Sequence, residues 1–242
     1  MASDAILFQI ASIVALIGMG LGWRGVMTRY SGFYDLPTAW SMMFWGILIG
    51  GLYGALGDNF MLIPYLTNKM ENSSITNLIV ICLILAVGVH LMLRRERVRR
   101  TGSQPTSGWT LGLAVGGMIA MFLILRMLQI YPVGTELVVS IIGVALISPR
   151  AHALVFCFHG YGMLQDKRWK AVIKTFILSA LLINGLYFAA KTPLAWIFII
   201  PFVLLAEKQS SDWVWAAVPS TARRRLRRIW ADQSRAKVKE EE

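Results

Sequence analysis

Apolar residues gather into seven long runs along the chain, and short polar stretches separate the runs. A helix needs roughly 20 apolar residues to cross a bilayer, and most of these runs approach that length. Lipid offers the backbone no hydrogen-bond partners, so spanning segments of this kind must be helical. The pattern predicts an all-α, polytopic transmembrane bundle with spans at residues 5–23, 39–56, 75–93, 109–130, 134–164, 171–190 and 193–207.

The fifth run is the longest and contains a proline, Pro149, near its middle. Proline lacks a backbone N–H, and its ring clashes with the preceding turn of a helix. We expect residues 134–164 to cross the bilayer once, with a break at Ser148–Pro149. The alternative, two separate helices, would raise the number of spans to eight.

Cations concentrate in alternate connections between the runs and in the C-terminal tail. Because Lys and Arg are enriched on the cytoplasmic side of a membrane, these segments should share one side. Seven spans achieve this with the N-terminus outside and the C-terminus in the cytoplasm, whereas eight would carry the basic tail across. The basic segments hold Arg24 and Arg29; Arg94, Arg95, Arg97, Arg99 and Arg100; Lys167, Arg168 and Lys170; and Arg223, Arg224, Arg225, Arg227 and Arg228.

Composition agrees with a multi-pass protein of the cell membrane. Of the 242 residues 56% are hydrophobic and 15% are charged, whereas a soluble domain carries about 25% charged residues. The first run follows only Met1–Asp4, with no cationic leader, so we expect a span rather than a cleaved signal peptide. Basic segments facing an anionic cytoplasmic leaflet explain the net charge of +11 without a nucleic-acid partner.

The chain divides into a bundle, residues 1–207, and a basic tail, residues 208–242. The tail can form an amphipathic helix with Leu226, Ile229 and Trp230 on one face. We expect it to lie on the membrane surface rather than to act as an RNA-binding arm. The residues predicted to contact the membrane surface are Arg223, Arg224, Arg225, Arg227, Arg228 and Trp230.

Two charged residues flank the tight turn between the fourth and fifth runs: Arg126 precedes Tyr131 by five residues, and Glu136 follows it by five. Antiparallel helices joined at this turn would bring both charges to a similar depth. We expect an ion pair that neutralises two costly charges; a proton or substrate site is the alternative.

Three further polar residues interrupt apolar runs and should contact neighbouring helices. His152 and His159 are seven residues apart, on one face of a helix. Asn184 lies within the sixth run, where its amide should find a partner inside the bundle. Imidazoles also bind metals, but a transition-metal site needs three or four ligands, so structural roles are expected.

Glycines recur at the spacing that lets membrane helices approach closely. The predicted packing positions are Gly46, Gly50 and Gly54 in the second run, and Gly112 and Gly116 in the fourth.

Three segments, in order, resemble the PrsW-type intramembrane proteases, relatives of the CAAX-processing membrane proteases. They are "LRRERVRRTGSQPTSGWTLGLAVGG", "ALISPRAHALVFCFHGYGML" and "LLINGLYF", which together cover roughly residues 90–190. The resemblance implies a helical membrane fold and, in active members, a metal site made of glutamates and two histidines.

Most of the catalytic positions that this resemblance implies are missing. No Glu-Glu pair stands near Ile75, where only Glu71 is close, and the glycine-rich helix contains no acid. Asn184 occupies the second histidine position, which leaves His152 alone. A metal-bound water cannot be activated without carboxylates, so the resemblance implies a catalytically silent relative.

Three functions follow from these observations. The first is a non-catalytic membrane subunit or binding protein without a cofactor, whose partners are the bilayer and other membrane proteins. The second is an active zinc protease that uses His152 with Glu136 or Glu71. The third is a transporter or channel, supported by the proline in the fifth run and by the charges at Arg126 and Glu136.

Overall fold

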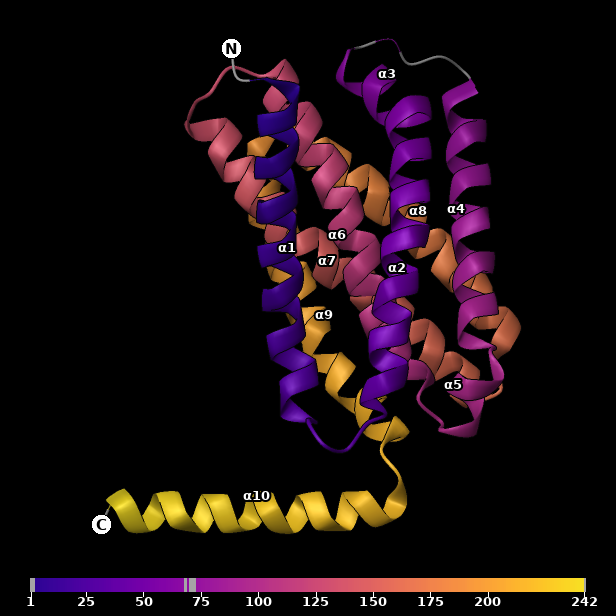
Figure 1. Cartoon of the computed structure of the whole chain (residues 1–242), viewed down its shortest axis with the longest axis vertical. Coiled ribbons are helices and arrows are strands. Elements are labelled where there is room, and N and C mark those ends of the chain that lie inside the picture. Colours follow the sequence, from indigo (N-terminus) through magenta and orange to yellow (C-terminus); the bar gives the residue numbers. More distant parts are fainter. Residues whose placement is uncertain (1–2, 68, 70–72, 242) are drawn as a thin grey trace.

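The computed structural model describes residues 3–67, 69 and 73–241, and helices joined by short turns make up this part of the chain (Figure 1). Within these described residues, seven helical segments are long and apolar enough to cross a membrane, which confirms the predicted number. The elements are α1 (Asp4–Arg29), α2 (Leu36–Gly57), a π-helical turn η1 (Asp58–Leu62), α3 (Ile63–Leu66), α4 (Ser73–Leu93), α5 (Glu96–Arg100), α6 (Gln104–Ile130), α7 (Thr135–Leu164), α8 (Arg168–Lys191), a 3₁₀ turn η2 (Pro193–Ala195), α9 (Trp196–Ala217) and α10 (Ser220–Glu241).

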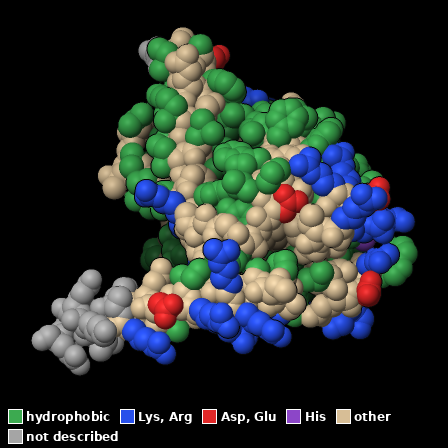
Figure 2. Space-filling model, turned by 60° about the horizontal axis from the view of Figure 1, so that its bottom comes forward, with side chains coloured by type: hydrophobic (Ala, Val, Ile, Leu, Met, Phe, Trp, Pro, Cys, Tyr) green, Lys and Arg blue, Asp and Glu red, His purple; other side chains and the backbone are tan. Residues whose placement is uncertain are grey.

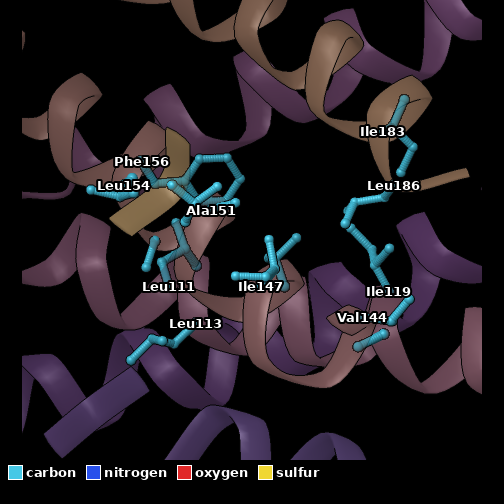
Figure 3. Packing of buried hydrophobic residues seen from close by; sticks show 14 of the residues in the cluster. Leu111, Leu113, Ile119, Val144, Ile147, Ala151, Leu154, Phe156, Ile183 and Leu186 are labelled. Carbon is cyan, nitrogen blue, oxygen red and sulfur yellow. The ribbon is translucent and has the colours of Figure 1, made fainter. Parts of the chain in front are cut away.

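Helices α6 and α7 form the centre of the bundle. In each of them 72% of the most apolar 18-residue stretch is buried, against 22% to 33% in the other five spans. The outer helices α1, α2, α4, α8 and α9 therefore leave broad apolar faces exposed, as membrane-facing helices do. Figure 3 shows part of the core, where Ile119 of α6, Val144 and Ile147 of α7 and Leu186 of α8 meet, each at most 3% exposed.

The fifth span is one uninterrupted helix, α7, so the predicted break at Ser148–Pro149 is wrong. Pro149 has no N–H to donate to Ala145, but neighbouring helices hold the chain on both sides of this point. The backbone oxygen of Ala145 faces Gly18 of α1, and Ser148 Oγ donates to Gly116 O of α6 at 2.7 Å. Tertiary contacts therefore offset the local defect.

The last span continues ten residues beyond the predicted boundary at 207, to Ala217. Ser210 and Val214 are buried against the bundle, which keeps the segment helical despite its polar composition. The helix ends at Val218, which is extended as expected for a residue before proline, here Pro219.

Helix α10 lies across the base of the bundle, roughly at right angles to the spans, and projects beyond them (Figure 1). The α1–α2 connection and α5 lie at the same end, which we call the α10 end; the start of α1 lies at the opposite, N-terminal end. Lys and Arg side chains gather over the α10 end (Figure 2). The basic segments thus share one side, as seven spans require.

Candidate functional site

An ion pair at the N-terminal end joins Arg126 of α6 to Asp58 of η1. Arg126 Nε donates to Oδ1 at 2.9 Å and to Oδ2 at 3.0 Å, and Nη2 donates to Oδ2 at 2.6 Å. The side chain of Asp58 is 4% exposed and that of Arg126 is 29% exposed, so the carboxylate is the more deeply buried partner. Arg126 Nη1 also donates to Gln129 Oε1 at 2.9 Å, and Gln129 Nε2 donates to Asp4 Oδ1 at 3.2 Å.

The partner of Arg126 is therefore Asp58, and the predicted pair with Glu136 is wrong. The sequence pattern placed Asp58 in a loop, but the second span continues through η1 into α3. The π turn appears in the hydrogen bond from Ile63 N to Asp58 O, five residues back. This turn directs Asp58 towards α6 rather than into a loop.

Glu136 instead lines an open cleft of about 460 Å³ at the N-terminal end, together with Tyr131, Ser140 and Lys191. Ser140 Oγ and the Tyr131 hydroxyl are buried and have no hydrogen-bond partner among the described residues. Burial raises the pKa of the Tyr131 hydroxyl above its ordinary value. The cleft thus presents hydroxyls and a carboxylate together.

His152 is 1% exposed in the middle of α7. Its Nδ1 donates to Ser148 O of the same helix at 2.8 Å, so this hydrogen bond does not join two helices. Its Nε2 is buried without a partner in the part of the chain that the structure describes. Gly116 of α6 lies against the ring, since a Cβ there would come within 2.9 Å of Nδ1.

The residues around His152 do not fit the metal site that the PrsW resemblance implies. No three His, Cys, Asp or Glu side chains among the described residues come close enough to hold a metal ion. Glu136 lies sixteen residues earlier in α7, about 24 Å along the axis. Glu71, the other candidate carboxylate, lies outside the described residues.

The three histidines form one pair and one isolated residue. His159 is fully buried, and its Nε2 lies 3.1 Å from Nδ1 of His90 in α4. On its other side, His159 Nδ1 lies 2.8 Å from Thr175 Oγ1 of α8. This imidazole chain, His90, His159 and Thr175, ties three spans together near the α10 end. His159 stands out in the sequence, but its partners on α4 and α8 do not.

Asn184 is exposed on α8, where it donates from Nδ2 to Ala180 O at 2.8 Å, one turn back in the same helix. The expectation that its amide binds inside the bundle is therefore wrong. The sequence alone does not show whether Asn184 faces the bundle or the lipid, because α8 is apolar on all its faces near this position.

Close helix packing depends on the predicted glycines and on further ones, among them Gly18, Gly108 and Gly160. A Cβ at Gly112 or Gly116 of α6 would collide with the α7 backbone, at His152 and Ser148 respectively. The glycines of the second run, in α2, pack against another side of the same central helix, α6. Gly46 packs on Leu111 and Ala114, Gly50 on Val115 and Met118, Gly54 on Phe122, Gly108 on Phe156, and Gly160 on Gln104.

A second pair of opposite charges, which the sequence pattern did not predict, joins α7 to α9. Arg150 of α7 approaches Glu207 of α9, with Nε and Oε2 4.0 Å apart and about four-fifths of each side chain buried. Arg150 Nη2 also donates to Leu21 O of α1 at 3.4 Å. The sequence does show a charged residue, Arg150, directly after Pro149, but its acidic partner, Glu207, is far along the chain.

The start of α10 is attached to the bundle by an aromatic contact that we call the α10 joint: Tyr30, Trp215, Arg223, Arg227 and Trp230. The rings of Trp215 and Trp230 stack at 5.6 Å and 26°, and Tyr30 meets Trp230 edge-on at 6.3 Å. Burial raises the pKa of the Tyr30 hydroxyl, which donates to Ser211 O at 3.1 Å.

Arginines complete the α10 joint. Arg223 Nε donates to Val218 O at 2.7 Å and Nη2 to Ala216 O at 2.9 Å, which caps the carbonyl end of α9. The guanidinium groups of Arg223 and Arg227 lie 5.8 and 5.5 Å from the Trp215 ring centroid.

The two faces of α10 therefore serve different purposes. Leu226 is 3% exposed and belongs to the core of the bundle, and Trp230 packs on Trp215. Two of the three apolar residues expected to face lipid thus contact protein. Arg224, Arg225 and Arg228 remain exposed.

Comparison of the chain with models of protein families, with curated proteins and with solved structures finds no match. The membrane-spanning architecture rests on the structure itself, and the PrsW resemblance remains a prediction from sequence.

Proposed function

We propose that this multi-pass membrane protein is a non-catalytic binding or scaffold subunit on a PrsW-like bundle in the cell membrane. In this role the bundle holds α10 against the cytoplasmic surface, where exposed arginines contact the anionic leaflet and other membrane-protein subunits. The observation that carries the proposal is the α10 joint.

The joint supports a presenting role because it fixes the start of the helix rather than leaving it as a loose tail. Each cation–π contact contributes about 0.5–1 kcal/mol at an exposed site, and Arg223 adds two hydrogen bonds to backbone oxygens. Each exposed cation near an anionic leaflet contributes about 1 kcal/mol of attraction. A helix held across the base of the bundle can offer Arg224 and Arg228, which lie opposite the buried Leu226, to another subunit and Arg225, at its side, to the leaflet.

The packed core supports this role over a transport path. The Asp58–Arg126 pair and the imidazole chain lie towards opposite ends of the bundle. Apolar side chains of α6, α7 and α8, including Ile119 and Ile147, fill the core drawn in Figure 3. A path for polar substrates would require these side chains to move apart.

Purification from native membranes in mild detergent tests the proposal. We expect other polypeptides to co-elute in stoichiometric amounts and to be lost when Arg224, Arg225 and Arg228 are all replaced by Gln. The matched control replaces Lys167, Arg168 and Lys170 by Gln, which removes the same charge from the start of α8. Elution of the wild-type chain without another subunit would contradict the scaffold role. Equal co-elution with both triple variants would contradict the role of α10.

A further inference from the structure

One strongly polar side chain, Asn184, lies on the outer, apolar surface of the bundle. It shares one face of α8 with Ile177, Leu181 and Phe188, which are 48%, 65% and 52% exposed. Their spacing of three and four residues forms a single stripe along a helix. The exposed surface of the bundle is apolar to either side of Asn184 on this stripe, so the amide stands alone among groups that suit lipid.

The position of Asn184 along α8 places it within the hydrocarbon layer. It follows Arg168 by sixteen residues and precedes Lys191 by seven. At about 1.5 Å per residue, these intervals are about 24 Å and about 10 Å, within a hydrocarbon layer about 30 Å thick. An amide has two N–H donors and a carbonyl acceptor. Among the described residues one donor is used, in the bond to Ala180 O.

We propose that the Asn184 stripe of α8, Ile177, Leu181, Asn184 and Phe188, is the interface of a homodimer. An amide is complementary to itself, because its oxygen accepts from the N–H of an identical amide. Two copies related by a two-fold axis beside Asn184 can therefore form two reciprocal hydrogen bonds. Lipid tails offer no such partner. The stripe carries no charge, so the same stripe of a second copy can cover its apolar side chains and pair with its amide.

Small residues beside Asn184 give a second helix room to approach. Ala180 and Gly185 are both partly exposed, and a Cβ at Gly185 would come no closer than an ordinary contact of 4.0 Å to Ile199 Cδ1 of α9. Small residues at such positions let transmembrane helices pack closely. The inference deepens the subunit role proposed above, since it names one partner as a second copy of the chain.

The test measures self-association of the purified full-length protein in liposomes, by energy transfer between labelled copies over a series of protein-to-lipid ratios. We expect Asn184→Leu to weaken dimerisation about 5- to 30-fold, the effect of one or two interhelical hydrogen bonds in a membrane. Asn184→Gln should retain most of the affinity. Asn59→Leu is the matched control, because Asn59 makes the same bond to the carbonyl four residues back, Ala55 O at 2.9 Å.

Cysteine cross-linking gives an independent measurement, since both native cysteines are 0% exposed. A cysteine at Leu181 should form disulfide-linked dimers in native membranes, whereas one at Leu16, which is 59% exposed on α1, should not. Monomers at every lipid ratio, dimers that Asn184→Leu leaves unchanged, or cross-links from position 181 to a different protein would each overturn the proposal. Because the liposomes contain only this chain, loss of the dimer is distinguishable from failure of the scaffold role, which concerns other subunits.

Discussion

The backbone oxygen of Ala145 in α7 points at Gly18 in α1, and no Cβ fits between them. Ala145 is four residues before Pro149, so its oxygen lacks the hydrogen bond that an N–H at position 149 would donate. Close approach of α1 therefore covers the one carbonyl that the proline leaves without its helical partner.

Replacing Gly18 by Ala should destabilise the bundle by about 1–3 kcal/mol, as overpacking of a core does. Gly20→Ala is the control in the same helix, since nothing lies within 4 Å of the added methyl. That substitution should be neutral or stabilising by up to about 1 kcal/mol. Thermal unfolding in detergent measures both, and equal melting temperatures would contradict the close contact.

The Asp58–Arg126 pair should respond asymmetrically to mutation. Arg126→Ala leaves a carboxylate that is 4% exposed without its partner, which should cost about 3–5 kcal/mol. Asp58→Ala should cost less, because the more exposed arginine can reach water. The double variant should be more stable than Arg126→Ala alone, and strict additivity in denaturant unfolding would argue against the pair. Glu136→Gln serves as the control and should change little.

Breaking the imidazole chain should loosen the contact between α7 and α8. Thr175→Val keeps the shape of the side chain but leaves His159 Nδ1 buried without its partner, which should cost about 1–3 kcal/mol. Thr175→Ser retains the hydroxyl and should unfold close to the wild-type temperature. If both variants unfold alike, the hydrogen bond at 2.8 Å contributes no stability.

His152 should be structural. Its Nδ1 donates to Ser148 O, so His152→Gln should keep more stability than His152→Ala. We expect the purified protein to contain no stoichiometric zinc by elemental analysis. Zinc that is present in the wild type and disappears in both variants would favour the protease alternative.

The orientation of the chain can be tested with single cysteines in the native background, where Cys82 and Cys157 are buried. A cysteine at Gln233 of α10 should react with a membrane-impermeant reagent only in inverted vesicles. A cysteine at Val133, which is 87% exposed in the α6–α7 turn, should react in intact cells. The reverse pattern would place α10 outside and remove the basis of the scaffold proposal.

The number of spans follows from sequence because it depends only on the length of apolar runs. The side that each residue faces does not, because a span is apolar towards both lipid and protein. Asn184 was therefore assigned to the interior and lies outside. The glycine spacing in α6 did predict a close helix contact, since glycines four residues apart in an apolar run, here Gly112 and Gly116, are typical of such contacts.

Long-range pairs were the least predictable feature. The sequence favours Glu136 as the partner of Arg126 because it is the nearest acid along the chain, yet Asp58 lies 68 residues away. Pro64 and the polar residues after it made this stretch resemble a loop. Arg150 and Glu207 likewise meet only because α7 and α9 pack together.

The π turn at Asp58–Leu62 has a consequence for how the chain tolerates changes in length. A turn with hydrogen bonds between residues five apart holds about one residue more than an α-helical turn. Losing one residue there, such as Asn59, would convert it into an α-helical turn and leave the direction of the following α3 nearly unchanged. Tyr65, whose ring lies 6.2 Å from that of Tyr187, would then keep facing the same side. The π turn thus absorbs one extra residue without rotating the helix beyond it, so a relative without the π turn would align with a gap at these positions.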